Sequence, residues 1–301
     1  MKVAQRTPSA PPIATAAAAA AVHASQQSIA PPLAASDHGG RLFPKAPVEH
    51  TAMAPAAQRA TGIENVFQKT IGKAAMAALK ASFSSKPVIL IAGDQLTGKS
   101  TVAKAVAAAF GGEASGTGRL MRAAADKAGK PIEEFVKSVA ADFDVQLDWQ
   151  ATKKIASGDV SVFESRLAGH LGQMLENMGR KNVVSVYLVA SPRERALRYL
   201  ARELSPAVRA RVEPQLVLPG DATLEQCMKA IVALNDPDAN KIASQWRDIA
   251  HRDDVDQARL LDLYAVDYQD RSAFDVVVTT DGKQPAAVQA EILAAVRART
   301  C

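Results

Sequence analysis

Cysteines are scarce in this sequence, and no stretch of it stays apolar for long. The 301 residues include only two cysteines, Cys227 and Cys301. Two cysteines cannot build the disulfide framework of a small secreted domain, and these two lack the spacing of metal ligands. We therefore expect free thiols, which are typical of a reducing compartment. No apolar run approaches the roughly 20 residues of a membrane-spanning helix, so no membrane span is predicted.

Acidic residues are scarce in the first part of the chain. Residues 1–86 contain nine Lys and Arg but three Asp and Glu, giving a net charge of +6, whereas the whole chain carries +5. The remainder is therefore nearly neutral, and the pI near 9.2 originates in the N-terminal part. Nucleic-acid binding requires clustered basic residues on the folded domain. The charge distribution therefore predicts no nucleic-acid partner.

Large apolar residues are rare in residues 1–60, which hold 19 alanines and 8 of the 16 prolines. Such a segment cannot bury enough surface to offset its chain entropy, so we predict a disordered Ala/Pro-rich leader over residues 1–60. Lys2 and Arg6 ahead of an alanine-rich run resemble a secretory signal in outline. A plain low-complexity tail, a cleaved signal and an organellar or secretion leader all remain open. We predict a cytoplasmic protein, with delivery elsewhere by the leader as the alternative.

An amphipathic pattern follows over residues 61–85. Its large apolar residues fall near one helical face and include Ile63, Val66, Phe67, Ile71 and Leu79. We expect this segment to be an amphipathic helix that packs on the domain or leads into it as a linker. A helix lying on a membrane surface is the alternative, because lysines occupy the rest of the helical wheel.

The strongest motif is a phosphate-binding loop at residues 93–100. An apolar, β-branched run at residues 88–92 predicts a buried parallel strand before it, and residues 101–110 predict an Ala-rich helix after it. That order is the context of the motif G-x-x-x-x-G-K-[ST], whose backbone N–H groups and lysine bind phosphates and whose hydroxyl ligates Mg²⁺. An ordinary glycine-rich turn is the alternative. We predict that ATP and Mg²⁺ bind here, and the predicted ATP-binding residues are Gly93, Asp94, Gln95, Leu96, Thr97, Gly98, Lys99, Ser100 and Thr101.

Strand-like and helical segments alternate through the rest of the folded part. Strands are predicted at residues 160–164, 183–189 and 276–278, a turn at 115–118, and helices at 119–128, 144–156, 166–178, 192–203 and 286–299. This alternation predicts an α/β fold with helices on both faces of a parallel sheet over residues 86–301. With the phosphate loop we expect a P-loop NTPase domain of three α/β/α layers and a mostly parallel five-stranded sheet, of which four strands are assigned here. The polar, helical residues 236–264 are expected to form a mobile lid.

Arginines in two other segments could hold a second phosphate. Gly118 and Arg122 lie at the start of a predicted helix, and Arg166 follows the strand predicted for residues 160–164. Guanidinium groups suit phosphates because they donate paired hydrogen bonds, and ligands gather at the carboxyl ends of parallel strands. Glu164 ends the same strand and could hold a Mg²⁺-bound water. An arginine alone is more often a solvated surface charge, but beside a phosphate loop these three positions become candidates for an acceptor site.

An ordered series of segments resembles the nucleoside monophosphate kinases, and among them the short cytidylate kinases of archaeal type. The resemblance covers residues 87 to about 292 and contains one insertion. Residues 122–135 fit the family pattern R-x-x-A-x-x-x-G-x-x-L-E-E-F without a gap. The other matching segments are residues 144–148, 164–169, 195–203, 252–259, 264–267 and 274–280.

The resemblance implies ATP-dependent phosphoryl transfer to a nucleoside monophosphate, CMP or dCMP, by a monomer. It implies three catalytic residues, Lys99 and the lid arginines Arg252 and Arg259. It also implies a monophosphate site formed by Gly118, Arg122 and Arg166, and a Mg²⁺ site formed by Ser100 and, through water, Glu164. Monophosphate-binding helices fall at about residues 113–158, and the lid with its insertion at about 204–265. For Arg252 and Arg259, a solvated helix face with neighbouring aspartates is the alternative.

Several positions depart from the family pattern. Gly116 stands where the family has a serine, Ser165 replaces a glycine and Val255 replaces the lid serine. Residues 204–243 are longer than in the family, and their prolines are expected to break any helix. Because these departures fall on acceptor recognition and lid motion, two alternatives stay open. One is phosphorylation of another small molecule or a macromolecule, and the other is a catalytically weak ATP-binding interaction module.

Overall fold

The computed structural model describes residues 61–140, 142–234 and 236–300. The leader predicted for residues 1–60 lies outside the described residues. Among the residues described, no helix is both long and apolar enough to cross a membrane.

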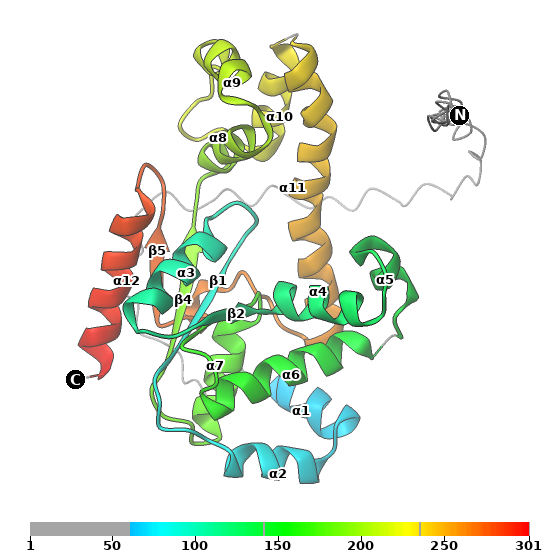
Figure 1. Ribbon diagram of the computed structural model, residues 1–301, viewed down its shortest axis with the longest axis vertical. Helices are drawn as coiled ribbons and strands as arrows, with labels where there is room; N and C mark the ends of the chain where they lie inside the picture. Colours follow the sequence, from blue (N-terminus) through cyan, green and yellow to red (C-terminus); the bar gives the residue numbers. More distant parts are fainter. Residues whose placement is uncertain (1–60, 141, 235, 301) are drawn as a thin grey trace, which may run out of the picture. The chain divides into compact units, whose positions relative to one another are not determined.

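A five-stranded, entirely parallel sheet forms the centre of the fold (Figure 1), and its strand order is β2-β3-β1-β4-β5. The strands are β1 (Val88–Gly93), β2 (Ala114–Gly116), β3 (Val162–Glu164), β4 (Val183–Val189) and β5 (Val276–Thr279). In β1, Ile89 pairs with Val162 on one side and with Val184 on the other. All six residues of β1 are buried, as a central parallel strand requires. The predicted parallel five-stranded sheet is confirmed.

Helices cover both faces of this sheet, and the alternation of side chains along β1 shows why. Ile89 and Ile91 point into one core, which is closed by α3 (Lys99–Ala109) and α12 (Pro285–Thr300). Val88 and Leu90 point into the other core, which contains residues of α1 (Thr61–Thr70), α6 (Phe143–Ser157) and α7 (Ala168–Asn177). Successive side chains of a strand point to opposite faces of the sheet. Both faces are therefore apolar and covered by helices, which gives the predicted α/β/α layers.

The structure differs from the sequence prediction at β2. Residues 115–118 are predicted to form a turn, but Ala114–Gly116 form a short edge strand that pairs with β3, and α4 (Thr117–Lys127) begins directly after it. The strand has three small residues and no β-branched side chain, so only its partner strand defines it. A Cβ on Gly116 would lie 2.3 Å from Cγ of Glu164, so the two strands approach more closely here than a side chain allows.

The second correction concerns the amphipathic segment. It is two helices, α1 and α2 (Lys73–Ala81), because Gly72 between them adopts a φ of 104° that other residues rarely take. Ile63 and Phe67 of α1 are fully buried, and the Phe67 ring meets the Trp149 ring edge-on with centroids 5.3 Å apart. Residues of α1 therefore belong to the core of the sheet domain.

The third correction concerns the insertion. Its prolines do not prevent helices, because Pro206 occupies the first turn of α9 (Pro206–Val212), where its missing N–H is tolerated, after the cap residue Ser205. A 3₁₀ turn (Glu213–Gln215) and α10 (Leu224–Ala233) follow. These elements share a small core with α8 (Pro192–Glu203) that includes Tyr199 and Cys227. They lie together at the top of Figure 1 beside the first half of α11 (Pro237–Tyr264).

Two further short elements complete the described chain. α5 (Ile132–Ser138) follows α4, and a 3₁₀ turn (Arg271–Ala273) precedes β5. The long helix predicted near residues 236–264 is present as α11, which runs from the insertion down to the sheet (Figure 1).

Candidate functional site

The loop between β1 and α3 is shaped by backbone conformations that its glycines allow. Gly93 has a φ of 144° and Gly98 a φ of 91°, both in a range that side chains disfavour. At Gly93 there is also no room, because a Cβ would lie 2.4 Å from the carbonyl oxygen of Leu188. The Thr97 hydroxyl donates to the Asp94 carbonyl at 2.9 Å and closes the turn. The loop therefore ends with α3 starting at Lys99, as a phosphate loop requires.

Lys99 is folded inward over this loop. Its ammonium group donates to the carbonyl oxygens of Gly93 at 2.7 Å and Asp94 at 2.5 Å. Burial, together with the nearby Arg166 cation, lowers the pKa of Lys99 to about 8. Asp94, Asp253 and Glu164 lie near enough to oppose this shift, so the two cations share the site with carboxylates.

Oxygen atoms suited to a hard cation lie at the start of α3. The Ser100 hydroxyl donates to Glu164, with distances of 3.1 and 2.9 Å to the two carboxylate oxygens. Glu164 is the last residue of β3, the strand beside β1. Within the described ranges, no group of three His, Cys, Asp or Glu side chains is placed to hold a metal ion. The pair fits Mg²⁺, which is typically bound by one or two protein oxygens together with phosphates and water.

Arg166 reaches from the end of β3 toward α11. Its guanidinium group pairs with Asp253 at 2.9 Å and Asp256 at 2.6 Å, and it donates to the Tyr268 hydroxyl at 2.8 Å. It also lies 5.0 Å from the centroid of the Tyr268 ring. Arg166 is therefore fixed by acidic and aromatic groups on and just after the long helix.

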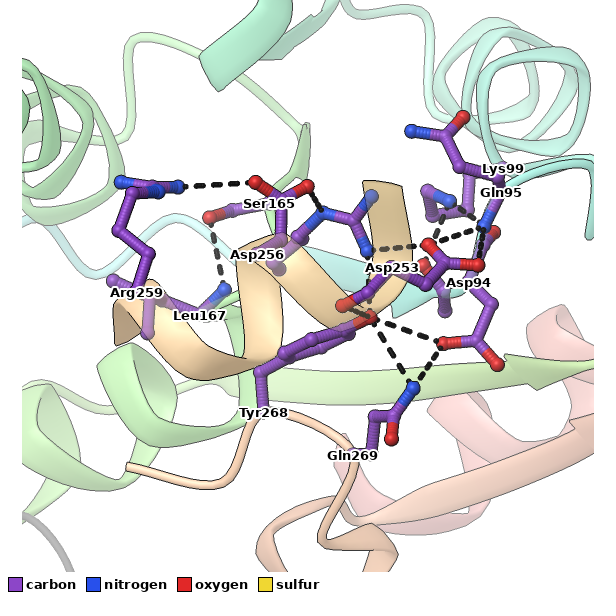
Figure 2. Close-up of polar contacts among 12 residues, drawn as sticks. Asp94, Gln95, Lys99, Ser165, Leu167, Asp253, Asp256, Arg259, Tyr268 and Gln269 are labelled. Atoms are coloured by element: carbon purple, nitrogen blue, oxygen red, sulfur yellow. Dashed lines mark hydrogen bonds and ion pairs between the residues drawn. The ribbon is translucent and has the colours of Figure 1, made fainter. Parts of the chain in front are cut away.

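Asp253 connects α11 to the phosphate loop itself. Its carboxylate accepts a hydrogen bond from the backbone N–H of Gln95, at 3.1 and 3.3 Å from its two oxygens. It also pairs with Arg195 of α8, and its side chain is 5% exposed. Figure 2 shows the Asp253 carboxylate beside Gln95 and Asp94 of the loop. A buried carboxylate in contact with a loop N–H and two guanidinium groups marks this place as an anion site.

Asp94, in the loop, has its own polar partners. One carboxylate oxygen lies 3.2 Å from the Tyr187 hydroxyl, 3.3 Å from the Tyr268 hydroxyl and 3.0 Å from the Gln269 amide nitrogen. Its other oxygen lies 3.7 Å from Arg195. This network ties the loop to β4 and to the segment after α11.

Comparison with known proteins supplies an independent finding. No protein-family model matches the chain. Cytidylate kinase from Sulfurisphaera tokodaii is 26% identical over 200 residues, which are 66% of this chain and 88% of that protein. Cytidylate kinase from Pyrococcus horikoshii is 28% identical over 213 residues, which are 70% of this chain and 88% of that protein. The chain is similar to cytidylate kinases. The resemblance predicted from the sequence is confirmed, and these relatives support a kinase.

Among solved structures, shikimate kinase from Aquifex aeolicus aligns with 70% of this chain and 97% of its own, at a TM-score of 0.35 and 13% identity.

The structure brings together only part of the residue set implied by the resemblance to cytidylate kinases. Lys99, Arg166 and the pair of Ser100 and Glu164 lie around the loop, as described above. Arg259 is farther along α11 and pairs with Asp144 of α6 at 2.6 Å.

Two predicted residues are separate from this cluster. Arg252 is exposed and has no hydrogen bond or ion pair with the described side chains. Arg122 is also exposed on α4 and, within the described part of the chain, forms neither contact. Its guanidinium lies above Gly118, 3.7 Å from where a Cβ on that glycine would be. The structure therefore holds Arg166 at the loop, whereas the Arg122 and Arg252 side chains are exposed.

Sequence reasoning missed Asp253 as a member of the site. A signal was present, because Asp253, Leu260 and Tyr264 are buried on the same face of α11, at helical spacings of seven and four. An aspartate on the apolar face of a helix needs a buried cation as partner. Arg195 was noted only as part of a family segment, and its role at the loop becomes visible once α8 is placed.

Proposed function

We propose that the protein transfers the γ-phosphoryl group of ATP to a nucleoside monophosphate, CMP or dCMP, and forms ADP and the nucleoside diphosphate. The observation that carries the proposal is the placement of Arg166 beside Lys99 and the phosphate loop in one largely buried site. Similarity to cytidylate kinases over most of the domain supports the acceptor class. In this proposal residues 86–301 carry the activity, with monophosphate-binding helices at about 113–158 and the lid at about 204–265.

The ATP side of the site is the loop. Residues 93–101 would surround the triphosphate with backbone N–H groups, and the Lys99 amine would turn from the loop carbonyls to the β- and γ-phosphates. Ser100 would ligate Mg²⁺, with Glu164 holding a water in its shell, since the two side chains already share a hydrogen bond. When bound, Mg²⁺ neutralises charge on the transferring phosphoryl group.

The acceptor side is formed by arginines. Arg166 and Arg122 would bind the monophosphate, and Gly118 would let it approach the start of α4. An oxygen of the acceptor phosphate forms a bond to the γ-phosphorus as the bond to the ADP oxygen breaks, so the two phosphates must lie in line. Arg252 and Arg259 would close over the transferring group from α11. Exclusion of water by this helix would favour transfer over hydrolysis.

A second candidate function keeps the fold and changes the acceptor. The family serine cannot occupy position 116 without displacing Glu164, because a Cβ on Gly116 would lie 2.7 Å from the Glu164 carbonyl oxygen. The chain therefore differs from the family pattern at a position that packs directly against Glu164. This observation favours a different small molecule or a macromolecule as the acceptor if nucleoside monophosphates fail.

A panel of acceptors tests the proposal. ADP release from ATP is measured with CMP, dCMP, UMP, AMP and GMP, and CMP or dCMP should give the highest kcat/KM. Arg122→Ala should raise the KM for the monophosphate about 10-fold or more, as loss of a charged hydrogen bond does, and leave the KM for ATP unchanged. The matched control is Lys127→Ala, an exposed cation near the end of the same helix, which should change neither constant.

Three results would contradict parts of this account. If Arg122→Ala weakened ATP and the monophosphate equally, the assigned acceptor site would be wrong. Stimulation by a non-nucleotide metabolite alone would establish the second candidate. ATP binding without turnover for any acceptor would indicate an interaction module.

A further inference from the structure

One carboxylate occupies a place where the proposed function requires a phosphate. Asp253 is separated from Gln95 by 158 residues, yet it accepts the Gln95 backbone N–H with both oxygens. Backbone N–H groups of such a loop serve to hold phosphate oxygens. A carboxylate presents two oxygens and a negative charge to the same donors.

The guanidinium groups around Asp253 strengthen this comparison. Arg166 and Arg195 approach it from two different elements, and the Arg195 side chain is 6% exposed. The Nε atom of Arg195 is buried and has no hydrogen-bond partner among the described residues. Two buried cations need a counter-ion, and a free donor on one of them indicates that Asp253 does not use the full binding capacity of the site.

We infer that Asp253 competes with the nucleotide phosphates for the loop and its arginines, an inference that rests on the proposed function. In the free protein its carboxylate neutralises Arg166 and Arg195 and keeps α11 against the loop. An incoming triphosphate takes over the Gln95 N–H and displaces the carboxylate. Arg195 then becomes a ligand of the triphosphate, and Arg166 is freed for the acceptor phosphate. α11 leaves the loop at this stage and closes over both substrates only when the acceptor has bound.

The contacts that are lost when Asp253 leaves are replaced by contacts with the phosphates. Asp256 lies on α11 as well, so Arg166 gives up both carboxylates as the helix moves, and the phosphates that enter replace both as its counter-ions. Lys99 already lies at the loop and needs only to turn from two carbonyl oxygens toward the phosphate. Asp253 must move into solvent, and nucleotide affinity is reduced by the fraction of protein in which it is docked.

Binding measurements on single variants test this inference. Asp253→Asn keeps the size of the side chain and removes its charge. If about nine-tenths of the free protein has Asp253 docked, the variant should bind ATP and inorganic tripolyphosphate about 10-fold more tightly than wild type. The matched control is Asp254→Asn, which removes the same charge from the next, exposed position of α11 and should bind like wild type.

A second measurement on the unaltered full chain avoids any folding defect of the variant. Hydrogen exchange is followed with and without tripolyphosphate, which carries no base or sugar. Peptides covering residues 93–100 should become protected, and peptides covering residues 251–259 should exchange faster because the helix has lost its contact with the loop.

The outcomes are distinguishable. If wild type binds ATP but Asp253→Asn binds it equally or more weakly, or residues 251–259 are unchanged or protected, the competitor role is overturned while the proposed kinase function stands. If neither wild type nor the variants bind ATP or tripolyphosphate, the proposed function fails, and this inference fails with it.

Discussion

The phosphate loop and α11 are held at the same site by different kinds of contact. The loop is local, because its lysine bonds to carbonyl groups five and six residues away and its glycines set its path. α11 is held there by contacts that are distant in sequence, with Asp253 lying 87 residues from Arg166 and 58 from Arg195. The loop is thus a rigid receptor for phosphate, whereas α11 depends on charges that a ligand can compete for. Variants on the two sides should therefore behave differently.

The largest effect is expected on the loop side. Lys99→Ala removes the one ammonium group at the loop and should lower kcat by about 10²–10³ or more, because stabilisation of transferring charge is lost. The measurement is steady-state ADP release at saturating ATP. Lys104→Ala, an exposed lysine of the same helix, is the matched control and should retain wild-type kcat. A similar loss in both variants would show that α3 has been disturbed and that Lys99 has no special role.

An intermediate effect, on stability, is expected from the contact that holds the C-terminal end of α11. Asp148 of α6 accepts a hydrogen bond from Tyr264, the last residue of α11, at 2.8 Å. Burial raises the pKa of Asp148 from 3.8 to about 7. Because the folded state holds this proton more tightly than the unfolded state, the stabilisation is present at low pH and is lost as pH rises toward 7.

This shift can be measured by denaturant unfolding at pH 5 and pH 8. Ionisation of Asp148 should make the free energy of unfolding about 2–3 kcal/mol lower at pH 8 than at pH 5. Asp148→Asn should remove that decline, and Asp126→Asn, at an exposed position of α4, should keep it. An unchanged pH dependence in Asp148→Asn would show that its carboxyl group is not protonated in the folded protein.

The smallest effect concerns the lid arginine. Arg259 is 40% exposed, and its ion pair with Asp144 should contribute less than about 1 kcal/mol to stability. Arg259→Ala should nevertheless lower kcat about 10-fold, as expected for a charged group that acts only on the transferring phosphoryl group.

Arg209→Ala provides the matched control for Arg259→Ala. Arg209 is 38% exposed and pairs with Glu213 in the insertion, away from the loop. This variant should keep wild-type kcat. Equal activity of both variants would remove Arg259 from the catalytic set.

The same contrast explains what the sequence could predict. β1 and the loop were predictable because a buried apolar strand and a glycine pattern are local properties. β2 was not, since Ala114, Ser115 and Gly116 have no strand preference and depend on β3 for their pairing. Pro206 was misjudged because a proline that breaks one helix can begin another.

The residues of the candidate site differ in the same way between local patterns and long-range contacts. Lys99, Ser100 and Glu164 lie around the loop, and each stands in or beside a local sequence pattern. Asp253 could not be assigned, because its role depends on the placement of Arg166 and Arg195 around it. The role of a charged residue on α11 depends on partners that only the fold brings near.

The central claim is that two anionic substrates meet between the Lys99 loop and the arginines. The most direct test is calorimetric titration with a single molecule in which adenosine and cytidine are joined through five phosphates. The account predicts one molecule bound per chain, about 100-fold or more tightly than ATP alone, and exclusion of both ATP and CMP. Binding no tighter than ATP, with CMP still able to bind alongside, would contradict it.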